Sequence, residues 1–434
     1  MDAEKRTVRF VTDNRLCTGC GTCLAACPKR AIAMRESPAG FPRPVIEEPQ
    51  CAHCGLCYDV CSGVHYHFEL PADVDGLFLP PLRALYLGRA TDPAIHALGQ
   101  SGGMATALLA CLMGRRDISH ALVTRMPADG SLRPQAFFAS SPAELLECVG
   151  SKYCLNPLNA VLPQWPAEAA GVAMVGLPCH VHGIRNLQHL LPKRWNDAFK
   201  LVIGLFCLQA EGYLGIDHLL RHRSQDKPVS RVLYRKKAAA GERGYPCIEY
   251  ADGTCQDFQE DFLWQFYNDS FAPLRCRFCF DQVNRMSDLA LADPNGFPPD
   301  VLSQGLNVVA VYTARGGEIL ERARQDGAVK LFPCDREQMR KGQVLLASRK
   351  PRVLSSYSRW KRLGRTAPDV PALRDLPARP ERLAMRMFLE YLWKLEAATS
   401  RPQAYRKLMR WIAFRRRVAK AKGWLARLLG RGRQ

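Results

Sequence analysis

Short apolar runs alternate with helical patterns along most of the chain. The run GVAMVG at 171–176 is continuously apolar, as expected of a buried strand, and a helical pattern resumes after Cys179. The run FKLVIGLFC at 199–207 has the same form and ends on Cys207. This alternation predicts a mixed α/β fold, in which ligands bind at the carboxyl ends of the strands.

No apolar stretch reaches the 18 residues that a membrane-spanning helix needs. The longest runs have the length of a strand. The opening MDAEKRTVRFVTDNR is charged throughout and contains no apolar leader. We therefore expect a cytoplasmic protein.

The chain becomes strongly basic beyond residue 346. Residues 401–434 contain twelve Lys or Arg and no acid, within a formal net charge of +20 for the whole chain. Six apolar residues recur there at spacings of three and four, which predicts one apolar stripe on a basic helix: Trp411, Phe414, Val418, Ala421, Leu425 and Leu428.

This basic helix is typical of attachment to a membrane surface, which would hold the protein at the inner face of the membrane. Alternatives are docking on an acidic partner, packing on its own domain, and binding of nucleic acid, which we do not expect.

Eighteen cysteines in such a chain indicate metal ligands or redox chemistry rather than disulfides. The run CTGCGTCLAACP at 17–28 has the spacing of a bacterial ferredoxin, whereas a structural zinc site takes two more distant pairs. The run CAHCGLCYDVC at 51–61 repeats the spacing, with Ser62 in place of the proline. Because the fourth cysteine of each run ligates the other cluster, two 4Fe-4S clusters are predicted, one on Cys17, Cys20, Cys23 and Cys61 and one on Cys51, Cys54, Cys57 and Cys27.

These runs predict a ferredoxin domain at 1–75. The run from first to last ligand is too short to bury much core, so the clusters would supply most of its stability. The proline-rich segment PADVDGLFLPPLRA is typical of a linker. A second domain is expected at 83–345, and a basic helical extension at 346–434.

A third metal site is suggested by Cys276 and Cys279, which form a C-x2-C pair. Cys179 and Cys207, at the ends of predicted strands, could complete it. Structural zinc and a thioredoxin-type redox pair remain alternatives. The other cysteines have no pattern and are expected to be small buried apolar residues: Cys111, Cys148, Cys154, Cys247, Cys255 and Cys334.

Two loops could hold a cofactor. One places Ser101, Gly102 and Gly103 before a helix whose first amides could bind a phosphate, or the glycines simply form a turn. The other could supply a hydroxyl, a charge and a stacking ring, or serve as an ordinary turn and helix cap: Ser151, Lys152 and Tyr153.

Six motifs in order resemble the coenzyme F420 hydrogenase/dehydrogenase beta-subunit family over roughly residues 83 to 335: SGGMATALL, VGSKY, VGLPCHVHGIRNL, IGLFC, CRFCFDQ and SDLALADP. The resemblance implies an iron–sulfur flavoprotein that binds FAD and one 4Fe-4S cluster. It would put FAD on Ser101, Gly102, Gly103, Thr106, Ser151, Lys152 and Tyr153, and the third cluster on Cys179, Cys207, Cys276 and Cys279. His180, in place of a common glutamine, and ADP at 292–294, in place of GD, depart from the family pattern.

The implied function is an oxidoreductase that couples hydride transfer at FAD, with reduced coenzyme F420, to one-electron transfer through the clusters and a redox partner protein or ferredoxin. The fused ferredoxin domain resembles the subunit of F420 dehydrogenases that feeds a respiratory complex. Alternatives are a ferredoxin-dependent reductase of an unsaturated small molecule and a non-catalytic electron-transfer subunit. No G-x-G-x-x-G run follows a strand, so NADH lacks its usual site.

Overall fold

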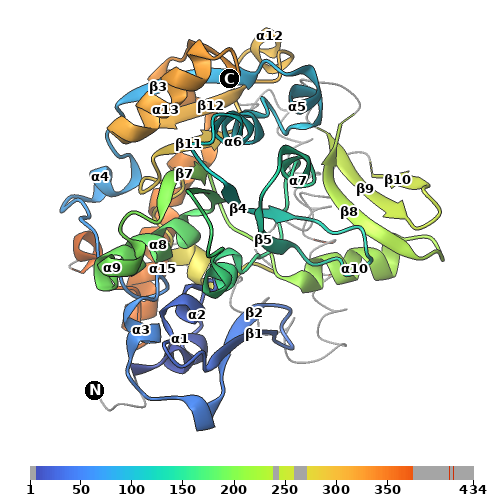
Figure 1. The fold of residues 1–434 in the computed structure, drawn as a ribbon. Coiled ribbons are helices and arrows are strands. Elements are labelled where there is room, and N and C mark those ends of the chain that lie inside the picture. The colour runs from blue at the N-terminus through green and yellow to red at the C-terminus, as the bar shows by residue number, and fades with distance from the viewer. Residues whose placement is uncertain (1–5, 238–243, 259–270, 375–409, 411–413, 415–434) are drawn as a thin grey trace, which may run out of the picture.

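The computed structural model describes residues 6–237, 244–258, 271–374, 410 and 414. Its N-terminal unit contains short helices and one antiparallel hairpin (Figure 1): α1 (Val8–Asp13), α2 (Thr22–Ala26), β1 (Ile32–Glu36), β2 (Pro42–Ile46), η2 (Glu48–Gln50) and α3 (Leu56–Asp59). Gly21 and Gly55 precede α2 and α3 with φ values of +85° and +80°. Glycine adopts this left-handed conformation without steric cost, so each cysteine run can turn sharply into its helix.

A large mixed sheet forms the centre of the molecule, in the order β13-β3-β12-β11-β7-β6-β4-β5. The strands β11, β7, β6 and β4 are parallel, and the outer ones run antiparallel to their neighbours. The bounds are β3 (Ala84–Ala90), β4 (His120–Arg125), β5 (Gln135–Ala139), β6 (Val172–Gly176), β7 (Phe199–Leu205), β11 (Leu289–Ala292), β12 (Asn307–Val311) and β13 (Val329–Pro333). The mixed α/β prediction is confirmed.

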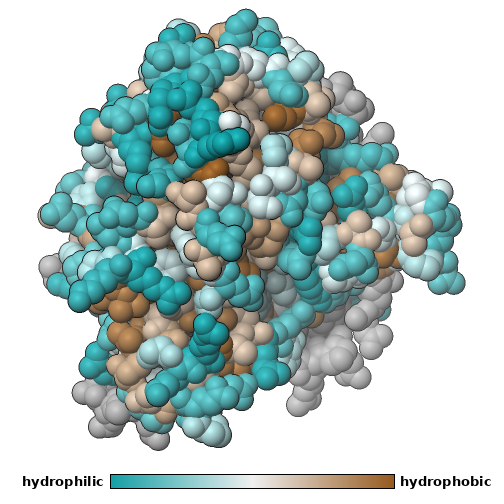
Figure 2. Space-filling model, in the orientation of Figure 1, coloured by the Kyte–Doolittle hydropathy of each residue, from teal (hydrophilic) through white to brown (hydrophobic). Residues whose placement is uncertain are grey.

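Helices cover this sheet and bury its apolar residues on both faces (Figure 1). They are α5 (Pro93–Leu98), α6 (Met104–Gly114), α7 (Pro142–Leu146), η3 (Leu158–Gln164), α8 (Pro178–Leu190), α9 (Pro192–Trp195), α12 (Pro299–Leu302), α13 (Ala314–Gln325) and α14 (Arg336–Gly342). The short helix α4 (Val74–Phe78) packs instead in the core shared with the N-terminal unit. The face in Figure 2 is largely hydrophilic, with smaller hydrophobic patches between the polar side chains. None of the helices in the described ranges is long and apolar enough to cross a bilayer.

A smaller antiparallel sheet lies beside the large one, next to α10 (Tyr213–Arg223) (Figure 1). Its order is β10-β9-β8, with β8 (Val229–Lys236), β9 (Tyr245–Tyr250) and β10 (Cys255–Asp257).

The helix α15 (Val344–Arg362) packs on η4 (Leu274–Phe278) and is followed by η5 (Pro371–Leu373). Its residues Val353, Tyr357 and Trp360 share one hydrophobic core with Phe278 and with the N-terminal unit. The helix begins before the predicted boundary at 346, and the domain division remains a prediction. The predicted basic helix of 401–434 lies outside the described residues, apart from the exposed Arg410 and Phe414.

The N-terminal unit packs tightly against the large domain. A Cβ added to Gly21 would come within 2.5 Å of the backbone nitrogen of Ala160 in η3. One added to Gly183 in α8 would come within 2.1 Å of the Thr22 hydroxyl. These contacts leave no space for a side chain between the cysteine-bearing α2 and the large domain.

We expect Gly21→Ala to destabilise the protein more than Gly253→Ala. Both residues have positive φ, +85° and +80°, so both substitutions carry a strain of about 1–2 kcal/mol. A Cβ at Gly253 meets nothing within 4 Å, whereas one at Gly21 meets Ala160 and costs a further ~1–3 kcal/mol. Denaturant midpoints of the anaerobic proteins measure the difference, and equal shifts would contradict the tight packing.

Candidate metal centre

The thiols of the first eight cysteines lie close enough to influence one another across the two runs, as the predicted crossed sets require. The pKa of the Cys23 thiol is raised by burial and then by the charges of Cys20, Cys17, Cys61 and Cys57. Burial also raises the pKa of Cys57, to about 11, and the nearby thiols act in the same direction: Cys54, Cys27 and Cys51. These contacts agree with sets that combine three cysteines of one run with the fourth of the other, and the assignment of each ligand remains a prediction.

The surroundings of both sets fit iron–sulfur clusters. A cavity is lined by all four cysteines of the second set, Cys27, Cys51, Cys54 and Cys57. Backbone N–H groups of Val8, Gly19 and Ala31 donate to the sulfurs of Cys57, Cys17 and Cys27, each at 3.3 Å. Such N–H groups stabilise cluster thiolates, and iron is what keeps buried thiols deprotonated.

The structure also brings together the four cysteines predicted for a third site. Cys179 lies in the first turn of α8, Cys207 follows β7, and Cys276 and Cys279 lie in and directly after η4. Burial raises the pKa of the Cys179 thiol, and the charges of Cys20, Cys207, Cys276 and Cys279 raise it further. In the described parts of the chain, no three His, Cys, Asp or Glu side chains converge on a single metal ion. Cluster binding by this set remains a prediction.

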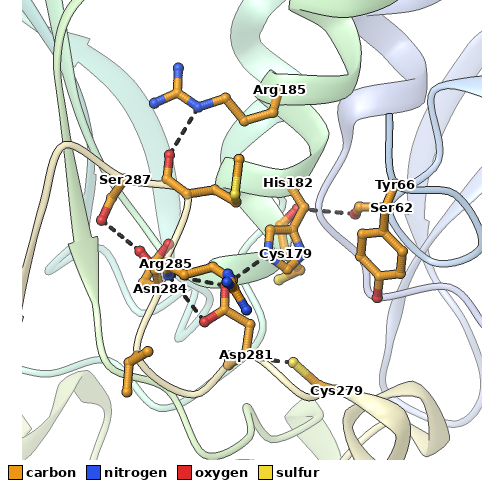
Figure 3. Close-up of polar contacts among 12 residues, drawn as sticks. Ser62, Tyr66, Cys179, His182, Arg185, Cys279, Asp281, Asn284, Arg285 and Ser287 are labelled. Carbon is orange, nitrogen blue, oxygen red and sulfur yellow. Dashed lines mark hydrogen bonds and ion pairs between the residues drawn. The ribbon is translucent and has the colours of Figure 1, made fainter. Parts of the chain in front are cut away.

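Ser62 connects the first and third sets. Its side chain is buried, and its hydroxyl donates to the backbone carbonyl of Cys179 at 3.0 Å (Figure 3). The same hydroxyl lies 3.9 Å from the sulfur of Cys20, which in turn contacts the Thr22 hydroxyl at 3.2 Å. The residue that replaces the ferredoxin proline therefore joins two cysteine sets across the interface.

Two buried arginines hold the loops of the third site, and neither was predicted from the sequence. Arg275 donates to the carbonyl of Gly63 at 2.8 Å and that of Ser62 at 3.2 Å. Arg349, from α15, donates to the carbonyl of Cys279 at 2.8 Å and that of Cys276 at 3.2 Å. Arg275 could have been suspected because it precedes Cys276, but no sequence signal connects the distant Arg349 to this loop.

The two histidines that follow Cys179 differ in their surroundings. The His180 ring accepts from the Leu177 N–H at 3.1 Å and donates to the Asn156 carbonyl at 2.9 Å. Burial lowers its pKa to about 4, so it is a neutral structural residue. His182 Nε2 lies 2.8 Å from the Asp281 carboxylate, and both side chains are buried (Figure 3).

The two predicted cofactor loops are connected through Asp293. The Ser101 hydroxyl donates to one Asp293 oxygen at 2.5 Å, and Arg235 pairs with the other at 2.6 Å. Arg235 also forms a hydrogen bond with Tyr153 of the second loop. Asp293 belongs to the ADP segment that departs from the family pattern, so this departure lies directly at the junction of the loops.

Several polar groups that were predicted to bind a cofactor form hydrogen bonds within the protein. The amides of Gly102 and Met104 donate to Asn307 Oδ1 at 3.0 and 3.3 Å. The Lys152 ammonium donates to the carbonyls of Val149 and Gly150 at 3.1 and 3.0 Å, and its pKa is lowered by burial to about 8. The assignment of FAD to these loops, including Ser151, and to Thr106 in α6 remains a prediction.

The six unpatterned cysteines are only partly as predicted. Cys154 and Cys247 are buried, and Cys111, Cys148 and Cys334 are half-buried. Cys255 is exposed, so that prediction is wrong. It lies on β10, which is the outer strand of its sheet among the described residues.

Comparison with known families matches three parts of the chain. The 4Fe-4S dicluster domain matches residues 16–62. The N-terminal and C-terminal domains of the coenzyme F420 hydrogenase/dehydrogenase beta subunit match residues 85–163 and 169–337.

Several F420-linked proteins are similar to this chain. The coenzyme F420 hydrogenase subunit beta of Methanococcus voltae is 32% identical over 57% of this chain and 83% of its own. One of the subunits of the F(420)H(2) dehydrogenase of Methanosarcina mazei is 26% identical over 73% and 84%. The coenzyme F420-dependent sulfite reductase of Methanocaldococcus jannaschii is 24% identical over 71%, and the chain spans only 46% of that protein.

A solved structure shares the fold. A chain of the F420-reducing [NiFe] hydrogenase complex from Methanosarcina barkeri superposes with a TM-score of 0.53 at 20% identity. The match covers 70% of this chain and 99% of that one.

Anaerobically purified protein should contain about twelve iron atoms per chain, four for each of three clusters. Cys179→Ser should lower the content to about eight, because it removes one ligand of the third set. Cys334→Ser, outside every set, is the matched control and should keep about twelve. About eight iron atoms and one zinc in the unmodified protein would contradict the third cluster and favour a zinc site at Cys276 and Cys279.

Proposed function

The chain belongs to the coenzyme F420 hydrogenase/dehydrogenase beta-subunit family, and on this basis we propose that it is an FAD- and iron–sulfur-dependent oxidoreductase. It couples two-electron hydride transfer, with reduced coenzyme F420 as the donor, to one-electron transfer toward a redox partner protein. FAD would accept a hydride in one step and release electrons singly, and each 4Fe-4S cluster would carry one of them.

The observation that carries this proposal is the junction at Ser62. A ferredoxin domain that is merely fused to another domain need not present its ligands to that domain. Here the Ser62 hydroxyl reaches both the Cys20 sulfur and the Cys179 carbonyl. Cys20 also lies close enough to Cys179 for its charge to raise the pKa of the Cys179 thiol. These contacts support the first and third sets as neighbours across the interface.

The order of the sets along the molecule also favours a relay. Cys54 of the second set is exposed, whereas Cys20 and Cys23 of the first are buried. Cys207 follows β7 and Asp293 follows its neighbour β11, so the third set and the joined cofactor loops lie at the same edge of the sheet. Electrons would pass between the cofactor loops at this edge and the exposed Cys54 of the second set through the third and first sets.

The protein's own residues would position the cofactors. The bonded series from Ser101 through Asp293 and Arg235 to Tyr153 fixes the two cofactor loops relative to each other. The backbone N–H donors at the sulfurs and the burial of the thiols would set the cluster potentials.

Reduced coenzyme F420 should bleach the flavin and then the clusters rapidly, whereas NADH should do so slowly or not at all. Anaerobic stopped-flow absorbance measures both reactions. Faster reduction by NADH would contradict the choice of carrier. Failure of both donors, with rapid reduction by ferredoxin, would reverse the direction of flow and indicate a ferredoxin-dependent reductase of an unsaturated substrate.

The basic segment 401–434 is proposed to dock the protein on an anionic surface, either a membrane or an acidic partner. Deleting it should preserve flavin and iron content but abolish binding to anionic vesicles or to the partner complex. Each basic residue near such a surface contributes about 1 kcal/mol, so binding should weaken steeply with added salt. Loss of the flavin, or precipitation of the truncated protein, would show that the segment is structural.

A further inference from the structure

Arg349 reaches the third cysteine set from outside the part of the chain that matches the family. The match ends at residue 337, whereas Arg349 lies on α15. Its side chain is only 2% exposed and donates to the carbonyls of Cys276, Cys279 and Leu208. Since Leu208 follows Cys207, one guanidinium holds both segments that carry three of the four cysteines.

This buried cation has no carboxylate partner among the described residues. The little-exposed Arg235, by contrast, pairs with the Asp293 carboxylate. Three carbonyls satisfy hydrogen bonds of Arg349 but do not neutralise its charge. An unpaired buried charge is costly, so a negative group near Arg349 is required to offset that cost.

The third cysteine set lies directly against Arg349, which donates to the carbonyls of Cys276 and Cys279, and can supply that negative charge. Four thiolates around a 4Fe-4S cluster leave a net negative charge, which grows by one when the cluster is reduced. A fixed cation therefore stabilises the reduced form more than the oxidised form.

We propose that Arg349 is a positioning residue of the third cluster, which braces its cysteine loops and raises its reduction potential by supplying a buried counter-charge. This inference rests on the proposed function, because it requires the third cluster to be present. It makes α15, beyond the family match, part of the redox site. The potential of the third cluster then depends on whether α15 stays docked on η4.

Three variants separate the charge from the bracing. Arg349→Gln removes the charge, Arg349→Lys keeps the charge but loses the planar fork of donors, and Arg185→Gln is the matched control. Arg185 is a half-buried arginine of α8 that donates to the Met286 carbonyl at 2.9 Å. Burial lowers its pKa, and the charged groups that act on it are Asp288 and Arg315 rather than any cysteine. Iron content and an anaerobic EPR-monitored redox titration are measured for each full-length protein.

We expect Arg349→Gln to keep about twelve iron atoms. It should disfavour reduction of one cluster at least tenfold, which corresponds to a reduction potential lower by about 59 mV for one electron. Arg349→Lys and Arg185→Gln should remain close to the unmodified protein. If Arg349→Gln fails to assemble the third cluster, the Arg349→Lys protein tests the role of the charge instead. It should retain both the iron content and the cluster potential of the unmodified protein.

An unchanged cluster potential in Arg349→Gln with full iron content would overturn the inference. Loss of the third cluster in both Arg349→Gln and Arg349→Lys would also overturn it, because Arg349 would then only hold the cysteine loops in place. About eight iron atoms in the unmodified protein is a distinct result, because it would contradict the third cluster and hence the proposed function itself.

Discussion

The close packing of the cysteine-bearing α2 against the large domain is the constraint on which the rest of the structure depends. Gly21 and Gly183 allow backbones to approach where any side chain would collide with Ala160 or Thr22. This approach brings the Cys20 sulfur and the Cys179 thiol into charge range of each other. Without it, the ferredoxin unit would be an appended domain with no defined route to the large sheet.

Burial at this interface creates an electrostatic requirement. Cys23, Cys61 and Cys179 are thiols whose pKa values burial raises, so they need iron to remain deprotonated. Arg275 and Arg349 are buried cations at the same loops, and both donate to backbone carbonyls of the cysteine segments or of the residues beside them. Negative clusters on these sets would offset the cost of burying the arginines, and the arginines would offset the cost of burying the clusters.

The sequence predicted the parts of the site that depend on local spacing. The C-x2-C-x2-C-x3-C runs predicted the 4Fe-4S dicluster domain, and the apolar pattern predicted the strand-to-helix break before Cys179. Contacts between distant segments could not be predicted in this way. Arg349 lies 70 residues from Cys279, and the link from Ser101 to Asp293 spans 192 positions, so only the folded chain brings them together. The exposed Cys255 was missed because a lone cysteine does not indicate which strand lies at the edge of a sheet.

The most direct test of the account is the EPR spectrum of the fully reduced, anaerobic protein compared with that of Cys179→Ser. If the Cys20 and Cys179 sets hold adjacent clusters in one relay, their unpaired spins interact, and the spectrum contains split or broadened features that disappear with the third cluster. A spectrum equal to that of Cys179→Ser plus an unsplit signal from one isolated cluster would contradict the relay.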